Sequence, residues 1–376
     1  MTSDDRPREA PGLYVHVPFC ESRCRYCAFP SGTRLDRMPR YVEGLLREAR
    51  MRSRGWDPLG TFYLGGGTPS LLPLPLLSRL VRGLRDALPF DAAGEWTIEA
   101  NPQDVTEERL EGWRNLGFHR LSLGVQALRD DFLALLGRRH DAARARLAMR
   151  LARDQGFDNL GIDLLFGIPG QGVADWIETL DEVIAFRPEH LSVYALTPEA
   201  RTPLARSVSA GTVRLPSDAL LARLYHAASD RLRMAGYLHY EVSNYALGEE
   251  YRSRHNRRYW RRVPVLGLGP GSHSFDGLRR WQNARSLEDW AGRLDQGLLP
   301  TVMEDPLTPE RSRLEVLMLG LRSLEGVPAS VLGDSAVARS RMDRLVARGL
   351  VRRRGDRLIP TDRGMFLADG MARLLA

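Results

Sequence analysis

The three cysteines of the chain are the residues best suited to chemistry, because all of them fall within eight residues. Cys20, Cys24 and Cys27 have the spacing C-x3-C-x2-C. An odd number of closely spaced thiols is a poor disulfide framework and is typical of metal ligation. One such loop can hold three irons of a 4Fe–4S cluster and leave the fourth iron open to another ligand. The alternative is a zinc site with His16 as fourth ligand, although structural zinc sites usually take their ligands as two spaced pairs.

Apolar segments of strand type alternate with amphipathic segments of helical period along the first half of the chain. The predicted strands are Leu13–Val17, Thr61–Leu64, Trp96–Ala100, Arg120–Gly124, Asn159–Leu165 and Leu191–Leu196. The helices predicted between them are Tyr41–Arg52, Leu76–Ala87, Glu107–Asn115, Ala142–Gln155 and Trp176–Phe186. This alternation predicts an α/β fold with parallel strands and right-handed crossovers, either an open sheet or a partial barrel. In both folds function gathers at the carboxyl ends of the strands, and the cysteine triplet follows the first strand.

The pattern changes after about residue 210. A long helix is predicted at Ser217–Ala235. From Leu307 onward the sequence predicts helices and then a short hairpin around Gly355 and Asp356, which resembles a winged-helix module. Such a module is more often a packing domain than a nucleic-acid binder, because fold does not imply function. The predicted parts are a barrel over 1–210, an accessory segment over 211–305 and an α-rich, winged-helix-like domain over 306–376.

The chain carries a net charge of +7, and all its basic residues are arginine. This charge suits an acidic partner such as phosphate, propionate carboxylates or an anionic membrane surface, and genomic base composition explains it equally. The N-terminal sequence MTSDDRPREAPG is polar, and no run of about 18 apolar residues follows. We therefore expect a cytoplasmic protein without a membrane-spanning helix, whose contact with a membrane is at most peripheral.

The chain resembles the radical S-adenosylmethionine (SAM) superfamily around the triplet, where it reads YVHVPFCESRCRYCAF. Within the superfamily it is similar to the group of oxygen-independent coproporphyrinogen III oxidases and heme chaperones (HemW). The resemblance runs from about Leu13 to Phe275. It implies a partial (β/α)6 barrel, a 4Fe–4S cluster on the three cysteines and SAM at the open iron. Reduction of bound SAM then yields a 5′-deoxyadenosyl radical, which is chemistry of the cofactor that the protein positions and shields.

The resemblance also implies which residues bind the cofactor. A glycine-rich turn after the second strand, Gly65-Gly66-Gly67-Thr68, lets a ligand approach the backbone without an intervening Cβ. An arginine suits the methionyl carboxylate of SAM and a carboxylate suits its ribose hydroxyls, although which residue meets which group stays open. The expected cofactor-binding residues are Tyr14, Tyr26, Gly66, Gly67, Thr68, Glu99, Gln126, Arg138 and Asp163.

Two features favour the heme chaperone branch over the oxidase branch. The oxidases carry a further cysteine two residues after the triplet, and Phe29 stands there in this chain. The sequence HNRRYW from His255 to Trp260 matches the HNxxYW motif of the chaperone branch. The resemblance implies His255 as an axial heme ligand, aromatic stacking on the macrocycle and arginines paired with its propionates. Alternatively the motif is a basic loop that packs on the barrel edge, and His273 is a second candidate ligand.

Three functions follow from these features. The leading hypothesis is a protein that binds the cluster, SAM and heme and delivers heme to acceptor proteins, expected to be respiratory. The second is radical decarboxylation of coproporphyrinogen III. The third is a radical enzyme that modifies nucleic acid. It ranks lowest, since the basic residues are scattered along the chain instead of being concentrated on the predicted recognition helix Val337–Arg348, and no nucleic-acid partner is expected.

Overall fold

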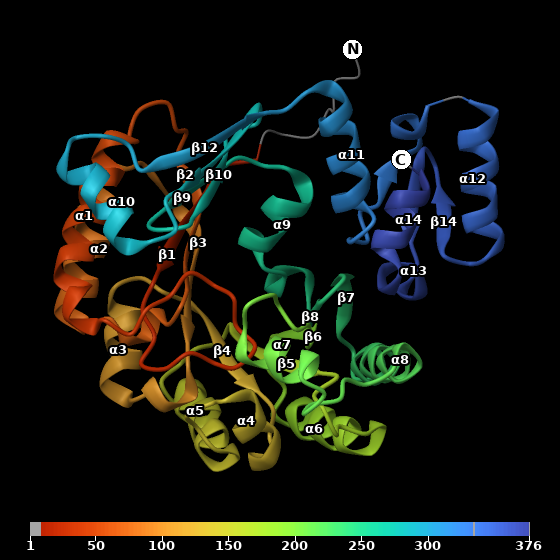
Figure 1. The fold of residues 1–376 in the computed structure, drawn as a ribbon, viewed down its shortest axis with the longest axis horizontal. Helices are drawn as coiled ribbons and strands as arrows, with labels where there is room; N and C mark the ends of the chain where they lie inside the picture. Colours follow the sequence, from red (N-terminus) through yellow and green to blue (C-terminus); the bar gives the residue numbers. More distant parts are fainter. Residues whose placement is uncertain (1–8, 334, 376) are drawn as a thin grey trace.

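The computed structural model describes residues 9–333 and 335–375, and twelve strands of these residues form one mixed sheet. Six parallel strands form its centre in sequence order (Figure 1). They are β1 (Gly12–Val17), β2 (Leu59–Gly66), β3 (Phe90–Ala100), β4 (Arg120–Gln126), β5 (Leu160–Phe166) and β6 (His190–Ala195). The intervening helices are α1 (Met38–Met51), α2 (Leu74–Ala87), α3 (Glu107–Asn115), α4 (Asp130–Leu136), α5 (Ala142–Asp154) and α6 (Val173–Phe186). The predicted α/β fold, a partial (β/α)6 barrel, is confirmed, and each predicted strand and helix of this region lies within a few residues of an observed one.

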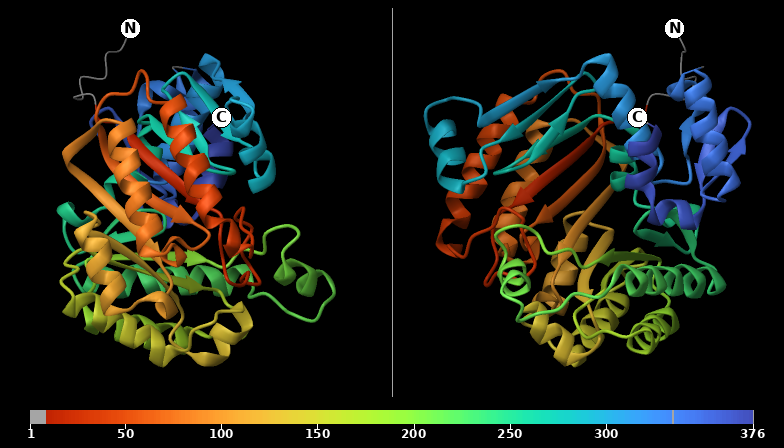
Figure 2. Two further views of the ribbon diagram at one scale, coloured as in Figure 1. Left: turned by 90° about the vertical axis from the view of Figure 1, so that its left-hand side faces the viewer. Right: turned by 45° about the vertical axis from the view of Figure 1, so that its right-hand side comes forward.

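The helices cover one face of the curved sheet because their apolar residues recur at helical spacing. On α2, for example, Leu77, Leu80, Val81 and Leu84 are all buried. The central strands are nearly continuously buried, as expected where a parallel sheet is covered on one face and closes on itself at the other. Figure 2 shows the helices on the outside of this curve. The carboxyl ends of β1–β6 therefore meet at one mouth, next to the loop that follows β1.

Shorter strands extend the sheet at both edges, and the sequence analysis predicted none of them. Antiparallel β8 (Asn244–Ala246) and β7 (Leu238–Glu241) pair beside β6, after helices α7 (Pro203–Ser209) and α8 (Asp218–Met234). On the other side, β9 (Val265–Leu268) pairs with β1 in parallel. Antiparallel β10 (His273–Phe275), β11 (Arg279–Asn283) and β12 (Thr301–Pro306) follow it, with α10 (Leu287–Asp295) before β12. Helix α9 (Arg254–Arg261), which carries the HNRRYW sequence, lies between these two edges.

Residues 309–333 and 335–375 form a separate small unit beside α9 (Figures 1 and 2). Its helices are α11 (Pro309–Gly320), α12 (Ala336–Ala347), α13 (Asp362–Phe366) and α14 (Ala368–Leu375). Its three-stranded sheet is made of β13 (Val327–Pro328), β14 (Val351–Arg354) and β15 (Arg357–Pro360). The hairpin predicted at Gly355 and Asp356 joins β14 to β15. Leu317, Leu345 and Leu358 belong to a hydrophobic cluster of this unit's own, which is distinct from the barrel core.

A buried carboxylate ties α1 to the β9–β12 edge of the sheet. Glu48 is fully buried and accepts hydrogen bonds from Asn283 Nδ2 at 2.6 Å, Trp290 Nε1 at 2.9 Å and the Gly269 amide at 3.0 Å. The guanidinium of Arg52 lies 3.2 Å away and neutralises its charge. Burial nevertheless raises the pKa of Glu48, which shows how far the surroundings exclude water.

We predict that Glu48→Ala lowers the free energy of unfolding by about 3–5 kcal/mol, because it leaves an indole N–H without its acceptor and a buried guanidinium without its counter-charge. Denaturant unfolding measures the change. The control is Glu43→Ala, which removes an exposed ion pair with Arg79 and is expected to cost less than about 0.5 kcal/mol. Similar losses in both variants would contradict this role for Glu48.

Candidate functional site

The loop that carries the three cysteines is closed by hydrogen bonds at its base. The Gly32 amide donates to Pro18 O at 2.8 Å, and the Cys20 amide donates to Gly32 O at 2.9 Å. Its middle is fixed as well, because the amide of Arg25 donates to Leu136 O and its carbonyl accepts from the Leu204 amide. Backbone contacts therefore hold the thiols at the carboxyl end of β1, where the alternation of strands and helices predicted a site.

The three thiols line one cavity, and two of them accept hydrogen bonds. Thr68 Oγ1 donates to Cys20 Sγ at 3.5 Å, and Arg138 Nη1 donates to Cys24 Sγ at 3.4 Å. Burial raises the pKa of Cys27. The thiolate is the form of cysteine that ligates iron. This donor set fits the three-cysteine attachment of a 4Fe–4S cluster.

The structure does not support the zinc alternative. Among the described residues, no three Cys, His, Asp or Glu side chains converge closely enough to share a single metal ion. His16 is buried, its Nε2 donates to Pro30 O at 2.7 Å and its Nδ1 accepts from the Tyr14 hydroxyl at 3.0 Å. Both ring nitrogens are therefore engaged within the barrel wall, and burial lowers the pKa of His16.

The glycine turn after β2 packs directly against the cysteine loop. Gly66 has a φ of +113°, which favours glycine, and a Cβ there would lie 2.6 Å from His16 Nδ1. A Cβ on Gly67 would lie 2.6 Å from Phe19 O. The Gly67 amide donates to Val17 O at 2.8 Å. Glycine is thus required here for the turn to approach both the loop and the cavity.

The cavity has a volume of about 440 Å³, which lies in the range of a site for one small-molecule ligand. The predicted site residues at its wall are Cys20, Cys24, Tyr26, Cys27, Gly66, Gly67, Thr68, Glu99, Gln126, Arg138 and Asp163. Two buried oxygens at the wall, Thr97 Oγ1 and Gln103 Oε1, have no hydrogen-bond partner among the described residues. Buried polar atoms of this kind call for a ligand or water, so the wall suits a polar ligand such as SAM.

Two buried carboxyls face the cavity. Glu99 accepts from the Tyr63 hydroxyl at 2.7 Å and from the Gly66 amide at 3.0 Å. Burial and the neighbouring Asp163 raise the pKa of Glu99 to about 7. Asp163 accepts from Ser122 Oγ, and burial raises its pKa too. Both groups are acceptors for ligand hydroxyls once they are ionised.

Arg138 joins the cluster end of the cavity to its wall. Its Nη2 donates to Asn101 Oδ1 and, at 2.8 Å, to Gly124 O. Asn101 Nδ2 in turn donates to Thr68 Oγ1 at 3.2 Å, so a chain of hydrogen bonds runs from Arg138 to Cys20. Gln126 ends β4 with a φ of +68°, and left-handed backbone in a non-glycine residue is concentrated at functional sites.

Sequence reasoning missed several wall residues: Tyr63, Thr97, Asn101, Arg120, Ser122, His190, Ser192 and Tyr194. A signal was available, because polar residues recur with period two in otherwise apolar strands. Thr97 and Glu99 on β3 are one such pair, and Ser192 and Tyr194 on β6 are another. Alternate residues of a strand face the same side, which here is the inside of the barrel.

Tyr14 and His255 are the two predicted site residues that do not line the cavity. His255 is 1% exposed and stacks on Tyr63, with ring centroids 4.9 Å apart. Its Nδ1 lies 2.8 Å from Thr61 Oγ1, and its Nε2 lies 3.1 Å from the Tyr259 hydroxyl. Burial lowers the pKa of His255 to about 3, so the imidazole is neutral. A neutral imidazole suits iron, but both of its nitrogens already have partners.

Comparison with known proteins agrees with the site. The family model of the radical SAM superfamily matches residues 14–183, and that of the HemN C-terminal domain matches 307–367. Heme chaperone HemW of Mycobacterium tuberculosis is 36% identical over 98% of this chain and 95% of its own length. The chain belongs to the HemW branch of the radical SAM superfamily. Proteins of this superfamily carry a 4Fe–4S cluster and use SAM, in keeping with the donor set and cavity described above.

A further relative supports the same branch, and a solved structure supports the fold. Heme chaperone HemW of Synechocystis is 36% identical over 84% of this chain and 78% of its own length. The solved structure of the coproporphyrinogen III oxidase HemN of Escherichia coli superposes with a TM-score of 0.84, over 99% of this chain and 91% of that one. At 23% identity this likeness shows a common fold.

We predict that Cys24→Ala abolishes the 4Fe–4S absorption of anaerobically reconstituted protein, since each thiolate holds a separate iron. Iron and sulfide analysis together with the visible spectrum measures the loss. The conservative control Ser22→Ala changes a cavity residue on the same loop and should retain the cluster. A complete cluster in Cys24→Ala would contradict the assignment.

The raised pKa of Glu99 predicts a pH dependence of stability in the cofactor-free protein. In the unfolded chain this carboxyl ionises near its ordinary pKa of 4.5, and in the folded protein near 7. The folded state therefore binds more protons between these values, so the free energy of unfolding falls as pH rises through this range. We expect the decrease in the free energy of unfolding between pH 5 and pH 7.5 to be about 1–3 kcal/mol smaller in Glu99→Gln than in wild type, as measured by denaturant unfolding at both pH values. An unchanged pH dependence in Glu99→Gln would contradict the burial of its charge.

Proposed function

We propose that this protein binds heme in addition to its cluster and SAM and delivers the heme to acceptor proteins, respiratory hemoproteins among them. The observation that carries the proposal is similarity along nearly the whole chain to relatives named heme chaperones. Phe29 supports it, because this residue stands where the oxidases have a further cysteine and its side chain is 63% exposed. Among the described residues, no helix has both the length and the apolar character of a bilayer span.

The cluster and SAM belong in the cavity. Cys20, Cys24 and Cys27 would hold three irons of the cluster, which would supply the electron for reductive cleavage of SAM. The chain's own residues place and shield the ligand. Arg138 offsets negative charge beside Cys24 and is an anchor for a carboxylate. Glu99 and Asp163 are acceptors for hydroxyl groups deeper in the barrel.

Heme belongs outside this cavity. A volume of about 440 Å³ is in the range for one small-molecule ligand, and SAM takes that place. Helix α9 forms part of the cavity wall through Asn256 and holds the remaining residues of the motif away from it. Tyr259 is 41% exposed, so this aromatic is accessible to a macrocycle. For His255 Nε2 to coordinate iron, the hydroxyl of Tyr259 must first leave it.

Radical decarboxylation of coproporphyrinogen III is the second candidate, and the shared fold with the oxidase structure favours it. This chain and the oxidase share a fold, but Phe29 stands at the position where the oxidases have their additional cysteine. Because fold does not determine function, the site decides between the two candidates. An anaerobic assay with coproporphyrinogen III, SAM and a reductant separates them, and we expect no decarboxylated product.

We predict that His255→Ala weakens heme binding at least tenfold, about 1.4 kcal/mol or more, because it removes the axial ligand. Anaerobic titration of the cluster-loaded protein, followed at the Soret band, measures the affinity. His119→Ala, which removes an exposed histidine on the barrel exterior, is the control and should bind like wild type. Identical titrations for His255→Ala and wild type would contradict His255 as the ligand.

A further inference from the structure

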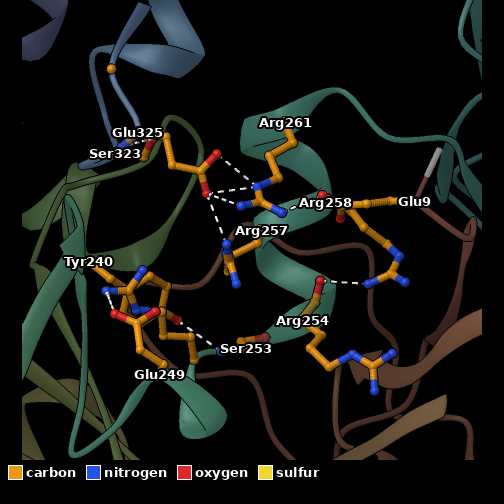
Figure 3. A network of polar contacts seen from close by, with 12 residues as sticks. Glu9, Tyr240, Glu249, Ser253, Arg254, Arg257, Arg258, Arg261, Ser323 and Glu325 are labelled. Atoms are coloured by element: carbon orange, nitrogen blue, oxygen red, sulfur yellow. Dashed lines mark hydrogen bonds and ion pairs between the residues drawn. The ribbon is translucent and has the colours of Figure 1, made fainter. Parts of the chain in front are cut away.

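Helix α9 is held on its outward face by carboxylates from two other parts of the chain (Figure 3). Arg257 Nη2 donates to Glu325 Oε1 at 3.0 Å, and Arg261 Nε lies 2.7 Å and 2.8 Å from the two oxygens of the same carboxylate. Glu9 pairs with Arg261 as well. The imidazole of His255 lies on a different face of the helix, against β2. Contacts on that inner face therefore decide how the ring is oriented.

Two neighbouring residues of the barrel bind His255 at different points. Thr61 of β2 and Glu95 of β3 are partners in the register of these parallel strands. Thr61 Oγ1 lies 2.8 Å from His255 Nδ1, and Glu95 Oε1 accepts a hydrogen bond from the His255 amide at 3.0 Å. One residue therefore contacts the ring, and the other fixes the backbone that carries it.

The buried carboxylate of Glu95 binds the first turn of α9. Its Oε2 accepts from the amide of Arg254 at 3.1 Å, so each of its oxygens binds an amide that has no partner within the helix. A carboxylate at the amino end of a helix also interacts favourably with the helix dipole. The buried guanidinium of Arg120 lies 3.9 Å from Oε2 and offsets part of the cost of burying the charge. Glu95 thus fixes the backbone of His255 to β3.

The hydroxyl of Thr61 bears on which ring nitrogen is free for iron. A neutral imidazole carries a proton on one nitrogen and a lone pair on the other. Iron takes the lone pair of Nε2, the nitrogen beside Tyr259, and the proton must then be on Nδ1. Thr61 Oγ1 is the acceptor for that proton, and Thr61 is completely buried, which keeps water from replacing it. Histidines that bind a metal commonly donate their other ring N–H to a protein acceptor in this way.

We propose that Thr61 and Glu95 are positioning residues for heme binding, which together hold the Nε2 lone pair of His255 where iron meets it. The proposal rests on the proposed function, in which His255 is the axial ligand. Neither residue is placed to touch heme, because Glu95 binds the backbone of α9 and Thr61 binds the ring nitrogen that iron does not take. Removing either group therefore alters heme binding only through His255. The ring keeps its place when the hydroxyl of Tyr259 leaves Nε2.

The test is an anaerobic titration of the cluster-loaded full chain with heme, in which the Soret band reports both affinity and axial ligation. We expect Thr61→Val, which keeps the shape of the side chain and removes its hydroxyl, to weaken heme binding about tenfold and to shift the Soret band. Thr61→Ser restores the acceptor and should restore both. Glu95→Gln should weaken binding by a similar factor, because a side-chain amide offers one acceptor oxygen to two backbone amides.

A role through His255 predicts that these effects disappear when the imidazole is absent. In the His255→Ala background, Thr61→Val and Glu95→Gln should cause no further loss of affinity. Two matched controls remove a buried hydroxyl and a buried carboxylate elsewhere in the fold. They are Thr179→Val on α6 and Glu48→Gln on α1, and both should bind heme like wild type. Thermal melting confirms that each variant is folded, and Thr61→Val tests the proposal without changing a buried charge.

Equal heme affinity in wild type, Thr61→Val and Glu95→Gln would overturn the proposal, as would losses of the same size with and without the imidazole of His255. The two proposals fail differently. If His255→Ala loses affinity and the variants of Thr61 and Glu95 do not, only the positioning role fails. If wild type binds no heme, the proposed function fails together with the positioning role. If wild type and His255→Ala bind heme identically, His255 is not the ligand and the positioning role fails with that assignment.

Discussion

The closure of the cysteine loop on itself is the constraint on which the rest of the site depends. Hydrogen bonds between Gly32, Pro18 and Cys20 fix the ends of the loop, and Arg25 ties its middle to the carboxyl end of α4. A loop that is already held in shape needs little further ordering when a cluster binds, so the three thiols are preorganised to serve it together. The glycine turn must then approach within contact distance, and the hydrogen bonds from Arg138 and Thr68 to cysteine sulfurs depend on the same placement.

Helix α9 contacts both the cavity and the C-terminal unit. Its inward side, through Asn256, borders the cavity assigned to SAM, and its outward arginines meet the carboxylates of the C-terminal unit. His255 faces Thr61 and Tyr63 of β2, with both ring nitrogens engaged. A heme carrier must bind heme reversibly. Where heme contacts replace hydrogen bonds that already exist within the protein, the lost bonds offset part of the free energy of binding, so the affinity is lower than the new contacts alone would give. The arrangement of α9 therefore suits transfer better than permanent storage.

The sequence predicted the parts that depend on local pattern. The alternating strands and helices from Leu13 to Leu196, the cysteine spacing and the glycine turn were all readable, because each is set by neighbours along the chain. Strands such as β8 and β10 have three residues each, which is too short for period two to be detected. The burial of His255 and the pairing of Arg261 with Glu325, 64 residues apart, arise from tertiary packing that no local pattern encodes.

Separation of the heme site from the SAM cavity is the claim that a single titration tests most directly. Heme is added to the cluster-loaded protein in the absence of SAM and in its saturating presence, and the Soret band is followed. Separate sites predict the same single-site binding curve in both titrations, because Asn256 and the rest of the cavity wall stay in place when heme binds. Displacement of heme by SAM would contradict the account and place the macrocycle inside the barrel.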